Sequence, residues 1–344
     1  MASIKTYFES AIKNDASDLH LVAGEKPMIR IQGELKDLAD SALPEKELQA
    51  AIFSILTPSQ KTRFEEELEL DMAYEVEGVR FRVNVHQQEG KIGLAARLIP
   101  KEIPNMDDLR FEPALREFSN LLDGLVLIVG PTGHGKSTTL ATIIEEINKT
   151  RKTHIITAED PIEFLFREKN SLIEQREVGV DTKSFANALK HILRQDPNVI
   201  LVGEMRDPET IAMVLTAAET GHLVFSTLHT SSAAEAVERI VDVFEGAKQQ
   251  QILIQLSSVL RGVVSQQLLP GKKGGRVAAR EILINTPAVA NLIKENNIAQ
   301  IKSAIQTGGK DGMITMENSL KQLEKEGLID SGMVQKRTGR QKKL

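Results

Sequence analysis

Hydrophobic and polar residues alternate in the first hundred residues of this chain. Along residues 79–85, valine and phenylalanine occupy every second position, and polar side chains occupy the positions between them. This period of two is typical of a strand with one buried and one exposed face. Short apolar runs predict further strands at 19–22, 28–32 and 91–99. Together with a helix predicted over 44–56, the pattern indicates an α+β domain over residues 1–100.

A different pattern begins near residue 120, where continuously apolar runs alternate with longer helical segments. The apolar runs predict strands at 125–129, 154–157, 199–202 and 223–227. The segments between them predict helices at 137–148, 183–195, 208–219 and 233–241. Strands this apolar, separated by helices, indicate a parallel sheet covered on both faces, so the fold class is α/β. Beyond about residue 246 the pattern predicts helices, a glycine-rich turn at 271–275 and a basic tail.

A polar connector that contains Pro104 and Pro113 separates the two patterns. We therefore predict two domains, residues 1–100 and 116–344, joined by a linker at 101–115. The chain of 344 residues is long enough for both to bury a core of their own.

Composition excludes several classes of protein. The chain has no cysteine, which excludes disulfides, thiolate zinc sites and thiol catalysis. A net charge of −5 and an aromatic content of 4% argue against a motor that acts on nucleic acid. The first residues carry no apolar signal segment, and no apolar run has the length of a membrane span. We therefore expect a cytoplasmic protein.

A glycine-rich loop lies between the predicted strand at 125–129 and the predicted helix at 137–148. It matches the pattern G-x-x-x-x-G-K-[ST], in which backbone N–H groups converge on nucleotide phosphates. In this pattern Lys136 reaches the β- and γ-phosphates, and the Ser137 hydroxyl holds Mg²⁺. The candidate binding residues are Gly130, Pro131, Thr132, Gly133, His134, Gly135, Lys136, Ser137 and Thr138. The sequence therefore predicts a nucleotide-binding protein.

Carboxylates follow two of the predicted strands. Glu159, Asp160 and Glu163 come just after the second strand of this half, and Glu204 comes after the third. The carboxyl ends of parallel strands are where α/β sheets bind ligands. One of the first three could orient or deprotonate the water that attacks the γ-phosphate. Glu204 takes the place of a Walker-B carboxylate, which holds Mg²⁺ directly or through water. The pattern leaves the division of labour between Glu163 and Glu204 open.

Histidine and arginine candidates carry less specific signals. His229 ends a predicted strand, where it could either sense the γ-phosphate or link it to Glu204. Arg80, Arg82 and Arg97 share one polar face of the first domain. That face is either simply solvated or supplies arginine fingers to the nucleotide of a neighbouring subunit. The second interpretation requires a ring of subunits.

Several of these segments together resemble the secretion ATPase superfamily, in its PilT/PilU branch of type IV pilus retraction ATPases. The segments that carry the resemblance are Ser17–Leu21, Gly130–Gly133, Glu159–Glu163, Leu201–Asp207 and Ala218–Thr230. They include the superfamily's phosphate loop, Asp box, Walker B and His box in the expected order, and the resemblance covers nearly the whole chain.

The resemblance implies a homohexameric ring in which each subunit has a PAS-like N-terminal domain and a RecA-like ATPase domain. ATP would bind between the two domains, assisted by Arg82 and Arg97. Glu163 would be the catalytic base, Glu204 the Walker-B carboxylate and metal ligand, and His229 the γ-phosphate contact. ATP hydrolysis with Mg²⁺ would power pilus retraction and twitching motility. The partners implied are an inner-membrane platform protein of the PilC kind, at its cytoplasmic side, and a paralogous retraction ATPase.

Two absences favour retraction over pilus extension or type II secretion. The ATPases of those systems usually carry a tetracysteine zinc site and an additional N-terminal domain, whereas this chain has no cysteine and starts at the PAS-like region. One segment departs from the retraction pattern. Where that pattern reads A-I-R-N-L-I-R-E, residues 288–295 read A-V-A-N-L-I-K-E, so both arginines are replaced. An accessory PilU-like retraction ATPase therefore remains an alternative, and so does an ATPase of pilus extension or type II secretion. A ring subunit that binds ATP without hydrolysing it is a further class, against which the intact Lys136, Glu163, Glu204 and His229 argue.

Overall fold

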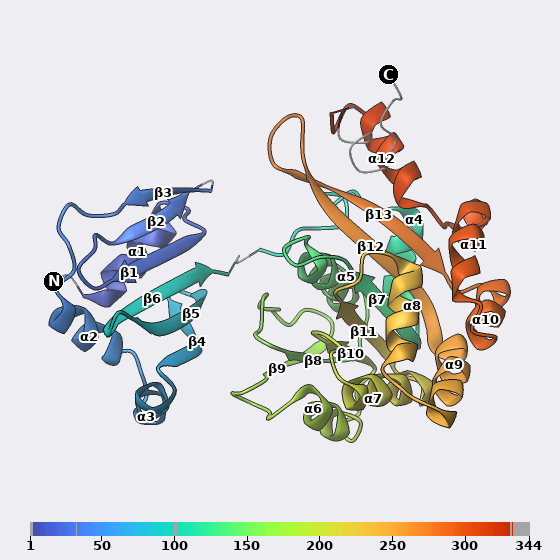
Figure 1. The fold of residues 1–344 in the computed structure, drawn as a ribbon, viewed down its shortest axis with the longest axis horizontal. Helices are drawn as coiled ribbons and strands as arrows, with labels where there is room; N and C mark the ends of the chain where they lie inside the picture. Colours follow the sequence, from blue (N-terminus) through green and yellow to red (C-terminus); the bar gives the residue numbers. More distant parts are fainter. Residues whose placement is uncertain (1–2, 32, 100–101, 331, 333–344) are drawn as a thin grey trace. The chain divides into compact units, whose positions relative to one another are not determined.

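The chain folds into two units, which a computed structural model describes over residues 3–31, 33–99, 102–330 and 332 (Figure 1). The first unit comprises Met1–Glu102 and the second Ile103–Leu344. Residue 101 of the predicted linker and the predicted basic tail at 336–343 lie outside the described residues. Within the described residues, no helix combines the length and the apolar character that a membrane crossing requires.

The first unit is built on an antiparallel sheet of six strands in the order β3-β2-β1-β6-β5-β4. The strands are β1 (Asp18–Val22), β2 (Met28–Ile31), β3 (Glu34–Asp37), β4 (Glu69–Val76), β5 (Val79–Gln88) and β6 (Lys91–Leu98). The helices are α1 (Ile4–Lys13), α2 (Glu45–Phe53) and α3 (Pro58–Glu67). The alternation along β5 has the expected result, because Phe81, Val83 and Val85 are fully buried in the core of this unit.

The second unit contains a seven-stranded sheet in the order β13-β12-β7-β11-β10-β8-β9. The strands are β7 (Gly124–Val129), β8 (His154–Glu159), β9 (Leu172–Glu177), β10 (Val199–Val202), β11 (Leu223–Leu228), β12 (Leu260–Pro270) and β13 (Arg276–Ile284). The pairs from β12 to β9 are parallel, and β13 is antiparallel to β12. This confirms the predicted parallel sheet and adds an antiparallel edge.

Helices cover both faces of this sheet. They are α4 (Pro113–Glu117), α5 (Lys136–Thr150), α6 (Phe185–Ile192), α7 (Pro208–Glu219), α8 (Ala233–Asp242), α9 (Ala247–Val259), α10 (Pro287–Lys294), α11 (Ile301–Thr307) and α12 (Met316–Lys325). Along β7, Leu125 and Leu127 pack with α6 to α11, whereas Val126 and Ile128 pack with α5. Burial on both faces explains why the strand is continuously apolar rather than alternating.

The prediction that the chain is helical beyond residue 246 is wrong for residues 260–284. These residues form the hairpin of β12 and β13, in which Gly271 N–H donates to the carbonyl of Gly275 in the turn. Strand β12 shows no alternation because both of its faces are covered: Val263 is buried in the apolar cluster of α6 to α11, and Val264 in the cluster of α5. A short run buried on both faces has no period that separates a strand from a helix.

Most of the predicted linker is packed within the second unit. Met106, Phe111 and Leu115 are buried in the same apolar cluster as α5. The prolines therefore indicate a segment without long helices or strands. From about residue 106 onward, this segment packs against the core of the second unit.

Candidate nucleotide-binding site

The candidate residues of the second unit come together at one edge of its sheet. Strands β7, β11, β10 and β8 are consecutive neighbours and run parallel, so their carboxyl ends share that edge. The phosphate loop follows β7, His229 follows β11, Glu204 follows β10, and Glu163 lies beyond β8. Ligands of open α/β sheets bind at this edge.

The phosphate loop has the strand–loop–helix geometry that its sequence predicts. It joins β7 to α5, which begins at Lys136. Gly130 has a φ of 145°, and a Cβ there would lie 2.4 Å from the Gln266 carbonyl oxygen. Gly135 has a φ of 78°, the left-handed conformation, immediately before the helix. Both positions require glycine, the first for space and the second for backbone conformation.

Lys136 points back into this loop. Its Nζ donates to the carbonyl oxygens of Gly130 at 2.8 Å and Pro131 at 3.1 Å. Burial lowers the pKa of Lys136, while Glu163 and Glu204 act in the opposite direction. The ammonium group is therefore held over the loop by weak, neutral acceptors, which a phosphate oxygen can replace with a charge-assisted hydrogen bond.

A chain of polar contacts links the loop to the neighbouring strands. Thr132 Oγ1 lies 3.3 Å from His229 Nδ1, and His229 Nε2 lies 3.3 Å from Glu204 Oε2. The side chain of Glu204 is only 12% exposed and also pairs with Arg206 Nε at 2.7 Å. His229 is thus in direct contact with Glu204, one of the two arrangements considered from the sequence. The imidazole connects the phosphate loop with the carboxylate beyond β10.

Glu159 and Glu163 occupy different environments although they are four residues apart. Glu159 is buried and accepts hydrogen bonds from Thr157 Oγ1 at 2.7 Å and from Gln175 Nε2 at 3.2 Å. Burial outweighs these contacts and raises the pKa of Glu159 to about 7. Glu163 is exposed, and its N–H donates to Glu159 Oε2 at 3.4 Å. Asp160 is exposed as well, and of these three carboxylates Glu163 is the one that acts electrostatically on Lys136.

The arginine candidates lie in the first unit. Arg82 on β5 and Arg97 on β6 are direct cross-strand partners, and both are exposed. Arg97 Nε donates to Asp18 Oδ1 at 2.9 Å, and Arg80 on the same strand as Arg82 is half-buried. The structure thus brings Arg82 and Arg97 together with each other, and their role toward a nucleotide stays a prediction.

The predicted metal ligands are both at the sheet edge. Ser137 is half-buried in the first turn of α5, and Glu204 lies just beyond β10. In the described part of the chain, no group of three or more histidine, aspartate and glutamate side chains forms a metal cluster. A hydroxyl and one carboxylate fit the way Mg²⁺ binds with substrate phosphates, keeping several waters.

Sequence reasoning missed Gln266 and Arg280, two buried polar residues of the hairpin. Gln266 Nε2 donates to the carbonyl oxygen of His134 at 2.8 Å, inside the phosphate loop. The His134 ring is also held, because Leu268 N–H donates to its Nδ1 at 3.1 Å. Gln266 lies beside the loop because β12 pairs with β7, and Arg280 contacts Gln266 from β13; a segment predicted as helix gives no indication of either pairing. No local signal identifies them.

Comparison with known proteins shows similarity over almost the full length. Residues 1–327 match the family described as Type II/IV secretion system protein. The chain is 48% identical to the type IV pilus retraction ATPase PilT of Pseudomonas aeruginosa, over 96% of this chain and 95% of that protein. It is 37% identical to the type IV pilus ATPase PilU of the same species, over 92% and 84%. A crystal structure of the pilus retraction motor PilT with bound ADP superimposes with a TM-score of 0.93 at 45% identity, covering 100% of this chain and 99% of that one.

Proposed function

Because the chain belongs to the family of type II/IV secretion system proteins, we propose that it is an ATP-hydrolysing motor that powers the retraction of type IV pili. The observation that carries this proposal is the arrangement of Lys136, His229 and Glu204 around one phosphate loop. It is supported by the similarity to a PilT structure that holds ADP. Retraction of this kind underlies twitching motility.

The loop residues 130–138 would bind the phosphates of ATP. Their N–H groups, the start of α5 and Lys136 provide positive potential on one side of the site. Ser137 and Glu204 would hold Mg²⁺, which neutralises the charge that develops on the phosphate oxygens. Nothing in this arrangement requires covalent catalysis, because phosphoryl transfer depends chiefly on positioning and electrostatic stabilisation.

Glu163 would orient and deprotonate the attacking water. Its carboxylate is exposed, unlike that of Glu159, which is enclosed and already bonded. His229 would connect the γ-phosphate to Glu204, since its two ring nitrogens already face Thr132 of the loop and the Glu204 carboxylate. A change at the γ-phosphate would then alter the contacts of His229 with Thr132, which follows β7, and with Glu204, which follows β10.

The working form would be a homohexamer. Arg82 and Arg97 would act on the nucleotide of a neighbouring subunit, as arginine fingers supplied in trans do in other phosphoryl-transfer enzymes. The ring would act at the cytoplasmic side of the inner membrane on a platform protein of the PilC kind. A paralogous retraction ATPase is a further partner.

The departure at residues 288–295 favours an accessory, PilU-like role as the second candidate. Val289 and Ile293 of α10 are buried and keep the apolar character of the pattern. The replaced arginines correspond to Ala290, which is half-buried, and Lys294, which is exposed. The change thus affects the surface of α10 rather than its packing. The greater identity to PilT than to PilU supports the first candidate.

ATP hydrolysis by the purified protein with Mg²⁺ tests the enzymatic part of the proposal. The parent protein should release phosphate steadily, and Lys136→Ala should not. Hydrolysis by both proteins at one rate would contradict the assignment of this site.

A further inference from the structure

Gln266 is a buried amide that lies against the phosphate loop without belonging to any motif of the site. It is 1% exposed. Its Oε1 accepts from Thr139 Oγ1 and from Arg280 Nε, both at 2.9 Å. Its Nε2 donates to the His134 carbonyl oxygen at 2.8 Å. The side chain therefore joins the loop, the helix that follows it and the last strand of the sheet.

The two donors at Oε1 determine which way the amide faces. Thr139 and Arg280 lie on the oxygen side, and an arginine guanidinium has no acceptor atom. The NH₂ group must then face the loop, where it meets the His134 carbonyl. A flipped amide would place NH₂ against Arg280 and an oxygen against the carbonyl, and both contacts would be lost.

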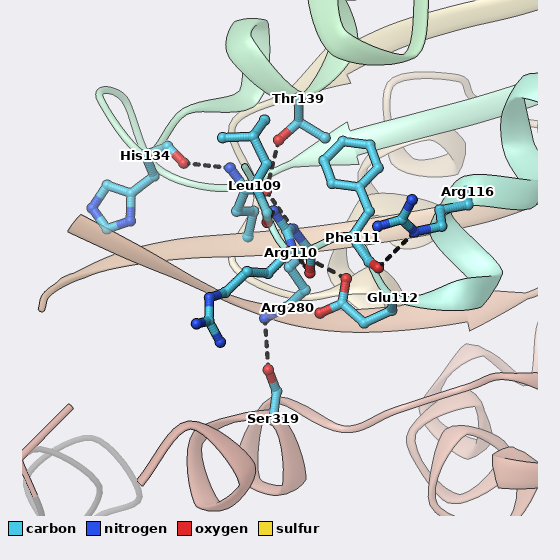
Figure 2. A network of polar contacts seen from close by, with 10 residues as sticks. Leu109, Arg110, Phe111, Glu112, Arg116, His134, Thr139, Arg280 and Ser319 are labelled. Atoms are coloured by element: carbon cyan, nitrogen blue, oxygen red, sulfur yellow. Dashed lines mark hydrogen bonds and ion pairs between the residues drawn. The ribbon is translucent and has the colours of Figure 1, made fainter. Parts of the chain in front are cut away.

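Arg280 is itself immobilised by its surroundings (Figure 2). Its backbone N–H donates to Ser319 Oγ at 2.9 Å, and its Nη1 donates to Glu112 Oε2 at 3.0 Å. Its Nη2 donates to the Leu109 carbonyl oxygen at 3.0 Å, and its guanidinium lies 5.1 Å from the ring centre of Phe111. Arg280 therefore holds the Oε1 atom of Gln266 in a fixed position.

The hydrogen bond to the His134 carbonyl oxygen also orients the N–H of the next residue, Gly135. In a trans peptide the C=O and the following N–H point in opposite directions across one plane. Holding the His134 carbonyl toward Gln266 on β12 therefore turns the Gly135 N–H to the side of the peptide that faces away from Gln266. Converging N–H groups of this kind are what bind phosphate oxygens.

We propose that Gln266 is a positioning residue of the nucleotide site, whose amide fixes the His134–Gly135 peptide so that the Gly135 N–H faces the nucleotide phosphates. Thr139 and Arg280 hold the amide in the orientation that this requires. The inference rests on the proposed function, because its ligand is the diphosphate of a bound nucleotide.

Isothermal titration of the full-length protein with ADP and Mg²⁺ tests the proposal. Gln266→Met keeps a side chain of similar length but removes both hydrogen-bonding groups. We expect its dissociation constant for ADP to rise about tenfold at unchanged stoichiometry, the effect of one misdirected hydrogen bond to a charged group. Gln251→Met, at an exposed position of α9, is the matched control and should bind as the parent does.

A second pair of variants leaves Gln266 in place. Thr139→Val removes one donor to Oε1 and should weaken ADP binding by about threefold, the loss of part of a neutral hydrogen bond. Thr139→Ser keeps the hydroxyl and should restore the parent affinity. This pair decides the question if Gln266→Met does not fold.

Two outcomes would overturn the inference. One is parent affinity in Gln266→Met together with parent affinity in Thr139→Val. The other is a lowered stoichiometry at an unchanged dissociation constant, which would show that Gln266 only stabilises the fold. A parent protein that binds no ADP would instead contradict the proposed function and, with it, this inference.

Discussion

Arg82 and Arg97 lie directly opposite each other on the neighbouring antiparallel strands β5 and β6. Both side chains are exposed, and the Arg97 side chain is 73% exposed despite its contact with Asp18. Like charges at opposed positions destabilise a sheet. The Asp18 carboxylate offsets part of this repulsion, and an anion lying against both guanidinium groups would relieve the rest.

Arg82→Gln should show separately how the charge of Arg82 affects the stability of the first unit and how it affects ATP turnover. Removing one of the two charges is expected to stabilise the first unit slightly, by roughly 0.2–1 kcal/mol. Turnover of ATP should nevertheless fall by about 1000-fold if the guanidinium acts as an arginine finger. Lys36→Gln, an exposed position on β3, serves as the control. Unchanged turnover in Arg82→Gln, or turnover per subunit that is unaffected by dilution to monomers, would contradict the role in trans.

Glu163→Gln tests the choice of base. The exposed carboxylate is replaced by an amide of the same shape, so the dissociation constant for ADP should stay that of the parent protein. Turnover should fall by about 100- to 10,000-fold, the usual contribution of a general base. The exposed Glu168→Gln provides a matched loss of charge nearby. Parent turnover in Glu163→Gln would show that another group activates the water.

His229→Ala removes the contact between Thr132 and Glu204. Because both partners remain in place, nucleotide binding should persist while the turnover number falls by about tenfold or more, as expected when a polar group positioned beside the reacting phosphate is lost. Single-turnover hydrolysis measures this step directly. The exposed His191→Ala is the control. A rise in the dissociation constant for ADP with no change in hydrolysis of bound ATP would argue that His229 acts in binding only.

Glu159 should make the free energy of unfolding of the protein depend on pH. Burial raises the pKa of Glu159 to about 7 in the folded protein, from the model-peptide value of 4.5. Between these values the folded state binds the proton more tightly than the unfolded state, so stability should fall as pH rises from about 4.5 to about 7. The shift corresponds to at most about 3 kcal/mol.

Thermal unfolding at pH 5.5 and pH 8 measures this effect in the parent and in Glu159→Gln. The variant should lose this part of the pH dependence, because its amide does not titrate. Glu168→Gln should keep it. An equal difference between the two pH values in the parent and in Glu159→Gln would assign the titration to another group.

The phosphate loop could be predicted because its chemistry is local. Nine consecutive residues, preceded by an apolar run and followed by a helical pattern, contain the whole signal. Glu163, Glu204 and His229 could also be placed at one sheet edge, because each follows a strand whose burial on both faces makes it continuously apolar. The order of the strands brings these residues together.

The hairpin of β12 and β13 could not be predicted in the same way. Its inner strand pairs with β7, whose residues lie more than 130 positions earlier. The role proposed for Gln266 depends on its hydrogen bonds with His134, Thr139 and Arg280. These residues become neighbours only in the folded chain. Strand β9 (Leu172–Glu177), with the sequence L-I-E-Q-R-E, is an edge strand whose polar composition gives no strand signal.

Imaging of fluorescently labelled pili in living cells tests the central claim most directly. The chromosomal gene would be replaced by the parent sequence or by Lys136→Ala, which cannot hold the nucleotide phosphates. We predict that cells with the parent sequence extend and retract their pili, whereas cells with Lys136→Ala extend pili that stay extended. Retraction at the parent rate in Lys136→Ala cells, or the absence of pili from them, would contradict the account of this protein as a retraction motor.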